Sequence, residues 1–159
     1  MRIGFSGSPT RGYDVVLLNE AIAKFLDAPL AEEVALVGIG NLGRAILAYF
    51  AGRHRRLAVT AAFDVDPEKT GRVIQGCRCH GMTELPGLVA QRGICTAIIA
   101  VPAEQAQAVT DALMAAGVKG LLNFAPVRLR VPPSVFVEHV DLTMSLEKVA
   151  FFSRQQGNG

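Results

Sequence analysis

The chain lacks several features that define specialised classes of protein. Its 159 residues include no tryptophan and only three cysteines. An odd number of cysteines without framework spacing argues against a secreted disulfide scaffold and favours a reducing, cytoplasmic setting. No apolar run is long enough to cross a bilayer, and residues 1–7 are too polar for a signal peptide. The formal net charge of only +2 gives no reason to expect a nucleic-acid or membrane surface.

Half of the residues are hydrophobic, and the strongest pattern among them is an apolar run followed by glycines. Val34 to Val37 predicts a buried strand, after which Gly38, Gly40 and Gly43 have the G-x-G-x-x-G spacing of a dinucleotide fingerprint. An apolar helical pattern comes next, at Leu42, Ile46, Tyr49 and Phe50. This order of strand, turn and helix raises an otherwise weak motif to a specific one.

Each glycine of the fingerprint has a distinct physical task. Gly38 allows the sharp turn, Gly40 allows the backbone to approach a pyrophosphate, and Gly43 lets the helix pack closely on the strand. The free amides at the start of the helix would face the phosphates. We therefore expect one half of the cofactor site to consist of Gly38, Ile39, Gly40, Asn41, Leu42 and Gly43.

An acidic residue occupies the position expected to hold the adenine ribose. Asp64 ends a second predicted strand, Leu57 to Phe63, about 20 residues after the last glycine of the motif. Its carboxylate would accept hydrogen bonds from the ribose hydroxyls and would repel a 2′-phosphate, so NAD is favoured over NADP. Val65, beside it, is expected to belong to the same site. The alternative is an ordinary residue at the end of a strand.

The remaining pattern alternates helices with strands. Asp14 and Pro29 bound a first helix, Asp66 to Gly71 predicts a helical turn, and residues 72–80 predict a strand or hairpin. The further elements are a helix from a Thr83 cap to Arg92, a strand Thr96 to Val101, a helix Glu104 to Ala116, and strands Lys119 to Phe124 and Val135 to Val140. Such alternation predicts an α/β fold, a Rossmann doubly wound parallel sheet with helices on both faces.

The ends of the fourth and fifth strands should border the nicotinamide half of the site. In doubly wound sheets, ligands lie along the carboxyl ends of the strands. We expect Val101 and Pro102 at one end, and Asn123 and Phe124 at the other, with Phe124 against the ring and Asn123 bonded to ribose or carboxamide. Each could instead be plain loop chemistry.

The last predicted helix, residues 142–154, is apolar on two sides. One stripe consists of Leu142, Leu146, Val149 and Phe152, while Met144 and Phe151 form a second seam. Such a helix should not lie half in water, so it predicts insertion into a partner and hence a homodimer. The alternative is a helix docked on its own sheet. We expect residues 1–13 to be a residual N-terminal arm, residues 14–141 the nucleotide-binding domain and residues 155–159 a frayed tail.

Other reactive side chains favour structural interpretations. Cys77, Cys79 and His80 lack the second pair of ligands that a structural zinc needs, so no metal site is expected. A disulfide between Cys77 and Cys79 would close a strained ring, although a redox role stays open. The basic run Arg53 to Arg56 is typical of a solvated turn, and His139 near a strand end is expected to be structural.

Five segments together resemble the C-terminal domain of the redox-sensing transcriptional repressors called Rex. They are VGIGNLGRAILAY, FDVDPEKTG, AVPAEQAQ, AAGVKGLLNFAPVRLRVP and VEHVDLT, in this order, and the resemblance covers about residues 10 to 152. The run GVKGLLNFAPVRL with VDLT downstream is far more specific than the glycine motif.

The resemblance implies a homodimeric sensor of NADH and NAD⁺ that is not an enzyme. NADH would close the dimer and release operator DNA, and the C-terminal helices would be exchanged between subunits. Tyr49 and Asp141 match the family's tyrosine and aspartate that are linked across the dimer when NADH is bound. The family's winged-helix DNA-binding domain is missing from this sequence, so operator DNA would be bound only through a domain not present here.

Two other functions fit the nucleotide-binding pattern. An NAD-dependent oxidoreductase needs a substrate pocket and a proton donor, and too few residues follow the last predicted strand to build them. A CoA-binding module shares the architecture and a similar VPA…AAGVKG stretch. Asp64 at the ribose position favours a dinucleotide over CoA.

Overall fold

The computed structural model describes residues 15–26, 31–52 and 56–157 of the chain. Their strands are β1 (Glu32–Val37), β2 (Leu57–Asp64), β3 (Val73–Ile74), β4 (Cys77–Gly81), β5 (Thr96–Ile99), β6 (Gly120–Asn123) and β7 (Phe136–His139). Their helices are α1 (Val15–Leu26), α2 (Asn41–Phe50), α3 (Leu85–Arg92), α4 (Ala103–Ala115) and α5 (Leu142–Gln156), with a short 3₁₀ helix η1 (Met82–Glu84). Asp14, Pro29 and the run Arg53 to Arg55, for which a cap, a stop and a basic turn were expected, lie outside the described residues.

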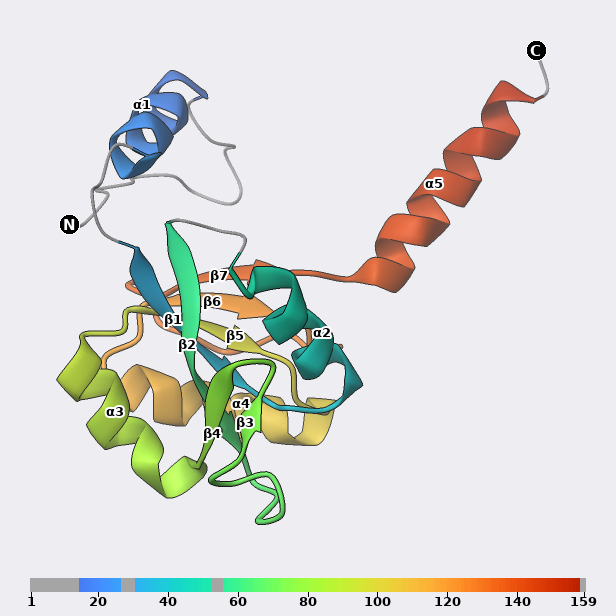
Figure 1. Cartoon of the computed structure of the whole chain (residues 1–159). Coiled ribbons are helices and arrows are strands. Elements are labelled where there is room, and N and C mark those ends of the chain that lie inside the picture. Colours follow the sequence, from blue (N-terminus) through green and yellow to red (C-terminus); the bar gives the residue numbers. More distant parts are fainter. Residues whose placement is uncertain (1–14, 27–30, 53–55, 158–159) are drawn as a thin grey trace.

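All strands belong to one sheet in the order β3-β4-β2-β1-β5-β6-β7 (Figure 1). The pairs β4–β2, β2–β1, β1–β5, β5–β6 and β6–β7 are parallel, and only the hairpin β3–β4 is antiparallel. The strand order reverses direction at β1, because β2 lies on one side of it and β5 on the other. The predicted doubly wound parallel sheet is therefore confirmed, with its switch point at the end of β1.

Helices cover both faces of the sheet, as expected. On one face, α2 packs on β1, β2 and β5 through a cluster that includes Leu36, Ile46 and Leu47. On the other face, α3 and α4 cover a larger cluster that includes Phe63 and Leu113 (Figure 1). Among the described residues, α2 is the only helix on its face, because the link between β2 and β4 is a turn and a hairpin.

The buried side of α2 agrees with the predicted pattern at Ile46 and Phe50 and differs from it at Leu42 and Tyr49. Gly43, Ile46 and Leu47 are buried, whereas Leu42 and Tyr49 are 40% and 56% exposed. The reason is Gly43, since a Cβ at this position would overlap the carbonyl oxygen of Gly38. The helix must turn that position toward the sheet, and Leu42 and Tyr49 consequently point away from the core.

Several element ends also differ from expectation. Thr83 is not a cap but lies inside η1, and the Glu84 side chain accepts a bond from the Gly81 amide at 3.0 Å before α3 begins. Asp66 to Gly71 forms the expected single turn, in which the Thr70 amide donates to the Asp66 carbonyl at 3.3 Å. In it the Asp66 carboxylate accepts from the Glu68 amide at 2.9 Å. The expected frayed tail is wrong for Gln155 and Gln156, which belong to α5.

The first and last helices stand away from the sheet (Figure 1). Val15, Val16 and Leu17 of α1 are all more than half exposed. No residue of α5 is buried. Its large apolar side chains are between 54% and 69% exposed: Leu142, Met144, Leu146, Val149, Phe151 and Phe152. The alternative of a terminal helix docked on its own sheet is therefore wrong.

The close approach of Gly43 to Gly38 predicts different effects for two alanine substitutions in the same loop. Gly43→Ala should destabilise the fold by at least about 2 kcal/mol, because backbone must move to admit the methyl group. This corresponds to a loss of about 4–8 °C in Tm. Gly40→Ala is the control, since nothing lies within 4 Å of a Cβ there and its φ is −81°. Equal melting temperatures for the two variants, measured by circular dichroism, would contradict the close approach.

Candidate nucleotide-binding site

The carboxyl ends of the parallel strands meet at one edge, and most of the predicted site residues gather there. Backbone bonds continue the sheet past the strands: the Gly38 amide donates to Phe63, Ala100 to Val37, and Phe124 to Ile99, at 2.8 to 2.9 Å. The first glycine of the fingerprint therefore lies next to the strand that ends in Asp64, and the residues after β5 and β6 continue along the same edge. The arrangement is that of a nucleotide site at a topological switch point.

Two of the three fingerprint glycines are required by the protein's own packing, and the third is not. Gly38 has φ +99°, and a Cβ there would overlap the carbonyl of Ala100. Gly43 is constrained by the carbonyl of Gly38. At Gly40 a Cβ would meet open space. Because packing does not explain the glycine at position 40, its lack of a side chain is best explained by the close approach of a ligand.

The start of α2 faces this open space with its amides available. Gly40 precedes the helix and contributes no side-chain bond to the first turn, which also contains no acidic residue. The unpaired amides and the helix dipole together favour an anion at this end. A phosphate group is the ligand for which this geometry is best suited.

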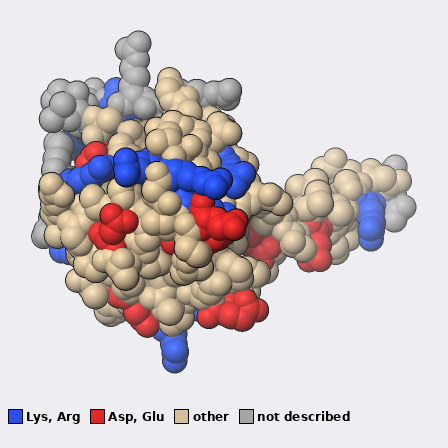
Figure 2. All heavy atoms as spheres, turned by 60° about the horizontal axis from the view of Figure 1, so that its bottom comes forward, with Lys and Arg blue, Asp and Glu red and all other residues tan. Residues whose placement is uncertain are grey.

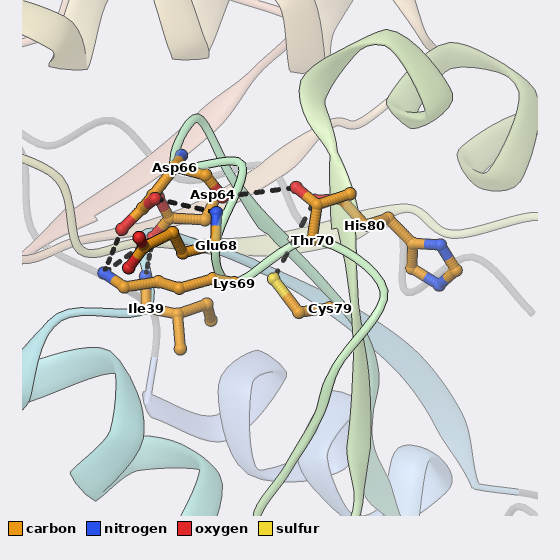
Figure 3. A network of polar contacts seen from close by, with 8 residues as sticks. All are labelled: Ile39, Asp64, Asp66, Glu68, Lys69, Thr70, Cys79 and His80. Atoms are coloured by element: carbon orange, nitrogen blue, oxygen red, sulfur yellow. Dashed lines mark hydrogen bonds and ion pairs between the residues drawn. The ribbon is translucent and has the colours of Figure 1, made fainter.

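Asp64 ties the glycine loop to the turn after β2. Its carboxylate accepts from the Ile39 amide at 2.7 Å and from the Asp66 amide at 2.9 Å, and the residue is only 9% exposed. The side chain thus has a fixed orientation at the end of its strand (Figure 3). Carboxylate lone pairs not used in these two bonds remain to accept ribose hydroxyls.

Lys69 is a member of this cluster that sequence reasoning missed. Its ammonium lies 3.6 Å from Asp64 Oδ2 and 4.0 Å from Asp66 Oδ2 (Figure 3). The Lys69 amide donates to the Asp66 carbonyl at 3.1 Å, which bends the chain back toward the carboxylates. In the sequence, Lys69 is only a single lysine in the turn that follows Asp64. Its ion pairs with the two aspartates depend on the geometry of that turn.

The other predicted contacts flank the loop. Val101 is 8% exposed and lies against Gly38, since its Cγ1 would be 2.9 Å from a Cβ added there. Pro102 is exposed and precedes α4. Val65 is 65% exposed beside Asp64, which leaves an apolar side chain next to the carboxylate. These positions suit the flat rings of a dinucleotide on either side of a pyrophosphate.

Asn123 does not have the role expected of it. It is fully buried, and its side chain accepts from the Ala125 amide at 3.0 Å and donates toward Val127 O and His139 Nδ1, each at 3.0 Å. The side chain therefore shapes the loop after β6 and offers no surface to a ligand. Phe124 is partly buried against the cluster under α2. His139 is exposed, and its Nδ1 lies 3.0 Å from the Asn123 side-chain amide.

Tyr49 and Asp141 are both on the surface of this chain. The Tyr49 ring contacts Phe50 edge-on, with 5.2 Å between ring centroids. Asp141 precedes α5, and its Oδ1 accepts from the Met144 amide at 2.9 Å. The aspartate is therefore the cap that determines where α5 begins.

The cysteines give no support to a metal or thiol switch. Within residues 15–26, 31–52 and 56–157, no three His, Cys, Asp or Glu side chains are grouped to hold a metal ion. Cys77 and Cys79 are buried and form no disulfide. Burial raises the pKa of both thiols, and the Asp64 carboxylate raises the pKa of Cys79 further.

No helix in the described part of the chain could cross a membrane.

Comparisons with known proteins agree with this geometry. Residues 31–127 match the family described as CoA binding domain. The chain is 41% identical to the redox-sensing transcriptional repressor Rex of Anoxybacillus flavithermus over 98% of its own length and 72% of the relative. It is 40% identical to the Rex of Lactobacillus acidophilus over 94% and 71%.

Solved structures of a Rex-family repressor are also similar to this chain. A Rex-family repressor, RSP, determined with NAD⁺ and operator DNA, superimposes with a TM-score of 0.76 at 30% identity. That match covers 97% of this chain and 70% of the other. The same repressor with NADH gives a TM-score of 0.76 at 29% identity over 93% and 72%.

Burial predicts unequal reactivity among the three thiols. In the folded protein at neutral pH, iodoacetamide should modify the exposed Cys95 first, while Cys77 and Cys79 should react only at higher pH or after unfolding. Mass spectrometry of tryptic peptides measures the order. Rapid labelling of Cys79 in the native state would contradict the raised pKa.

Proposed function

Because this chain belongs to the Rex family of redox-sensing transcriptional repressors, and to the CoA-binding-domain family over residues 31–127, we propose that it binds NADH and NAD⁺ and reports the ratio between them. The chain would be the sensing half of a repressor that acts in the cytoplasm. Its relatives are named as repressors and not as enzymes.

One observation carries the proposal: Gly40 has no packing reason to be glycine, and it lies between the free end of α2 and the carboxylate of Asp64. The pyrophosphate would lie over Gly40 and the first-turn amides. The adenine ribose would bond to Asp64, with Val65 beside the adenine. Val101, Pro102 and Phe124 would border the nicotinamide, and Asn123 would support their loop without direct contact.

We propose further that α5 inserts into a second copy of the chain and that the redox signal travels through this dimer. The six exposed apolar side chains of α5 have no cover within the described residues of one copy. Tyr49 and Asp141 would be linked across the interface when NADH is bound. A cofactor can bias such an interface only if its two redox forms differ in affinity for the two dimer arrangements. Operator DNA would be released in a protein that also carries the DNA-binding domain.

The CoA alternative deserves a direct test because of the matching family model. CoA and NAD share an adenosine and a pyrophosphate, so the glycine loop alone does not separate them. The orientation of Asp64 supports the dinucleotide, since its carboxylate would repel the phosphate that CoA carries on its ribose.

The test is calorimetric titration of the chain with NADH, NAD⁺ and CoA. We expect NADH to bind more tightly than NAD⁺, and both to bind more tightly than CoA. Asp64→Ala should weaken NADH by roughly 1–3 kcal/mol through lost hydrogen bonds. Gly40→Ala should weaken NADH without lowering the melting temperature.

Either of two results would reject the sensor. Tighter binding of CoA than of NADH would favour the CoA module, and equal affinities for the two redox forms would remove the basis of sensing. An unchanged NADH affinity in Asp64→Ala would reject the ribose role alone.

The exposed stripe of α5 predicts a dimer that one substitution disrupts. Leu146→Glu should raise the dimer dissociation constant at least about 100-fold, because a buried leucine and its apolar contacts are lost. Lys148→Glu on the same helix is the matched control and should leave the dimer intact. Analytical ultracentrifugation measures both. The same constant for Leu146→Glu and the parent would show that α5 is not the interface.

A further inference from the structure

Lys69 is held by carboxylates at the place where a nucleotide ribose would bind. Its ammonium lies 3.6 Å from the Asp64 oxygen that also accepts the Ile39 amide, and its side chain is 25% exposed against 10% for Asp64. The second carboxylate, that of Asp66, is at 4.0 Å. The lysine is therefore partly buried and directed into the site, not outward into solvent (Figure 3).

The charge of this turn is unbalanced. Asp64, Asp66 and Glu68 are acidic, and Lys69 is the only basic residue from position 64 to position 71. A ribose 2′-hydroxyl is neutral and can donate to a carboxylate, whereas a 2′-phosphate carries close to two negative charges at neutral pH. With the ammonium engaged by Asp64, the face presented to the ribose is acidic and a 2′-phosphate is repelled.

Within the described residues, Lys69 is the cation that forms ion pairs with Asp64 and Asp66. In the space-filling view, Lys and Arg form a band over one side of the molecule, with acidic groups below it (Figure 2). Arg72, the next basic residue after the turn, is exposed and has no ion pair with Asp64 or Asp66. The Lys69 ammonium, in contrast, is held in place by its ion pair with the Asp64 carboxylate.

We propose that Lys69 is a specificity-determining residue, a phosphate-binding group that Asp64 keeps occupied, so that the Asp64–Lys69 pair decides between a 2′-hydroxyl and a 2′-phosphate. This inference rests on the proposed NADH site. It assigns discrimination to the pair: Asp64 accepts the hydroxyls of NADH, and by holding the ammonium it also withholds the group that would bind NADPH. Removing Asp64 therefore both weakens NADH and releases a cation for the 2′-phosphate.

The experiment is a double-mutant cycle read with two nucleotides. Affinities for NADH and NADPH are measured for the parent, Asp64→Ala, Lys69→Met and the double variant, with melting temperatures as a check of folding. Asp64→Ala should move the ratio of affinities at least about tenfold toward NADPH, from one charge-assisted bond gained and another lost. Adding Lys69→Met should remove most of that gain for NADPH, and adding Lys69→Arg should retain it.

Two further arms separate this role from general electrostatics. Arg72→Met removes a nearby cation that contacts neither carboxylate, and in the Asp64→Ala background it should leave the ratio unchanged. In the parent background, where Asp64 is intact, Lys69→Met should move the ratio several-fold further toward NADH, because an acidic site loses its compensating charge. This second arm can be read even if Asp64→Ala does not fold, with Arg72→Met in the parent as its control for overall charge.

The outcomes are distinguishable from failure of the proposed function. A parent chain that binds NADH, together with a ratio that Lys69→Met does not change in either background, overturns the role of Lys69 alone. A gain for NADPH that Arg72→Met removes equally would assign it to overall charge. A parent chain that binds CoA more tightly than NADH overturns the proposed function, and this inference with it.

Discussion

The structure depends on one close approach, between the glycine at the third position of the fingerprint and the carbonyl of the first. Gly43 lies so near Gly38 that no side chain fits between them. This contact determines which side of α2 faces the sheet. It also aims the free amides of the helix start at the carboxyl edge and turns Tyr49 outward. A packing constraint thus orients both the phosphate end of the site and the residue proposed to report on its state.

The second organising interaction is the bond from the Ile39 amide to Asp64. It joins the loop after β1 to the turn after β2, two segments 25 residues apart in sequence. The ends of a dinucleotide site are therefore held in place before any nucleotide binds. The same carboxylate engages Lys69, so the charge that a ribose meets is a property of a small network and not of one acid.

The C-terminal helix α5, in contrast, makes no packing contact that buries any of its residues within the described chain. Its apolar side chains are exposed along its whole length, while Asp141 fixes its first turn. An apolar surface of this kind is costly in water, and it marks an interaction site. The proposed exchange between subunits would bury it and would connect the helix to the edge of the sheet where the nucleotide is expected.

The alternation of strands and helices, the glycine motif and the ribose acid could be predicted from the sequence, because each depends on residues that are near one another along the chain. The two-sided α5 was equally visible in its spacing. Only the tertiary structure decided that Leu42 and Tyr49 point away from the sheet, that the Asn123 side chain bonds within its own loop, and that Lys69 pairs with Asp64. The physical reason is that a local pattern specifies backbone conformation and apolar faces, whereas the partner of a side chain depends on strand register and turn geometry between distant segments.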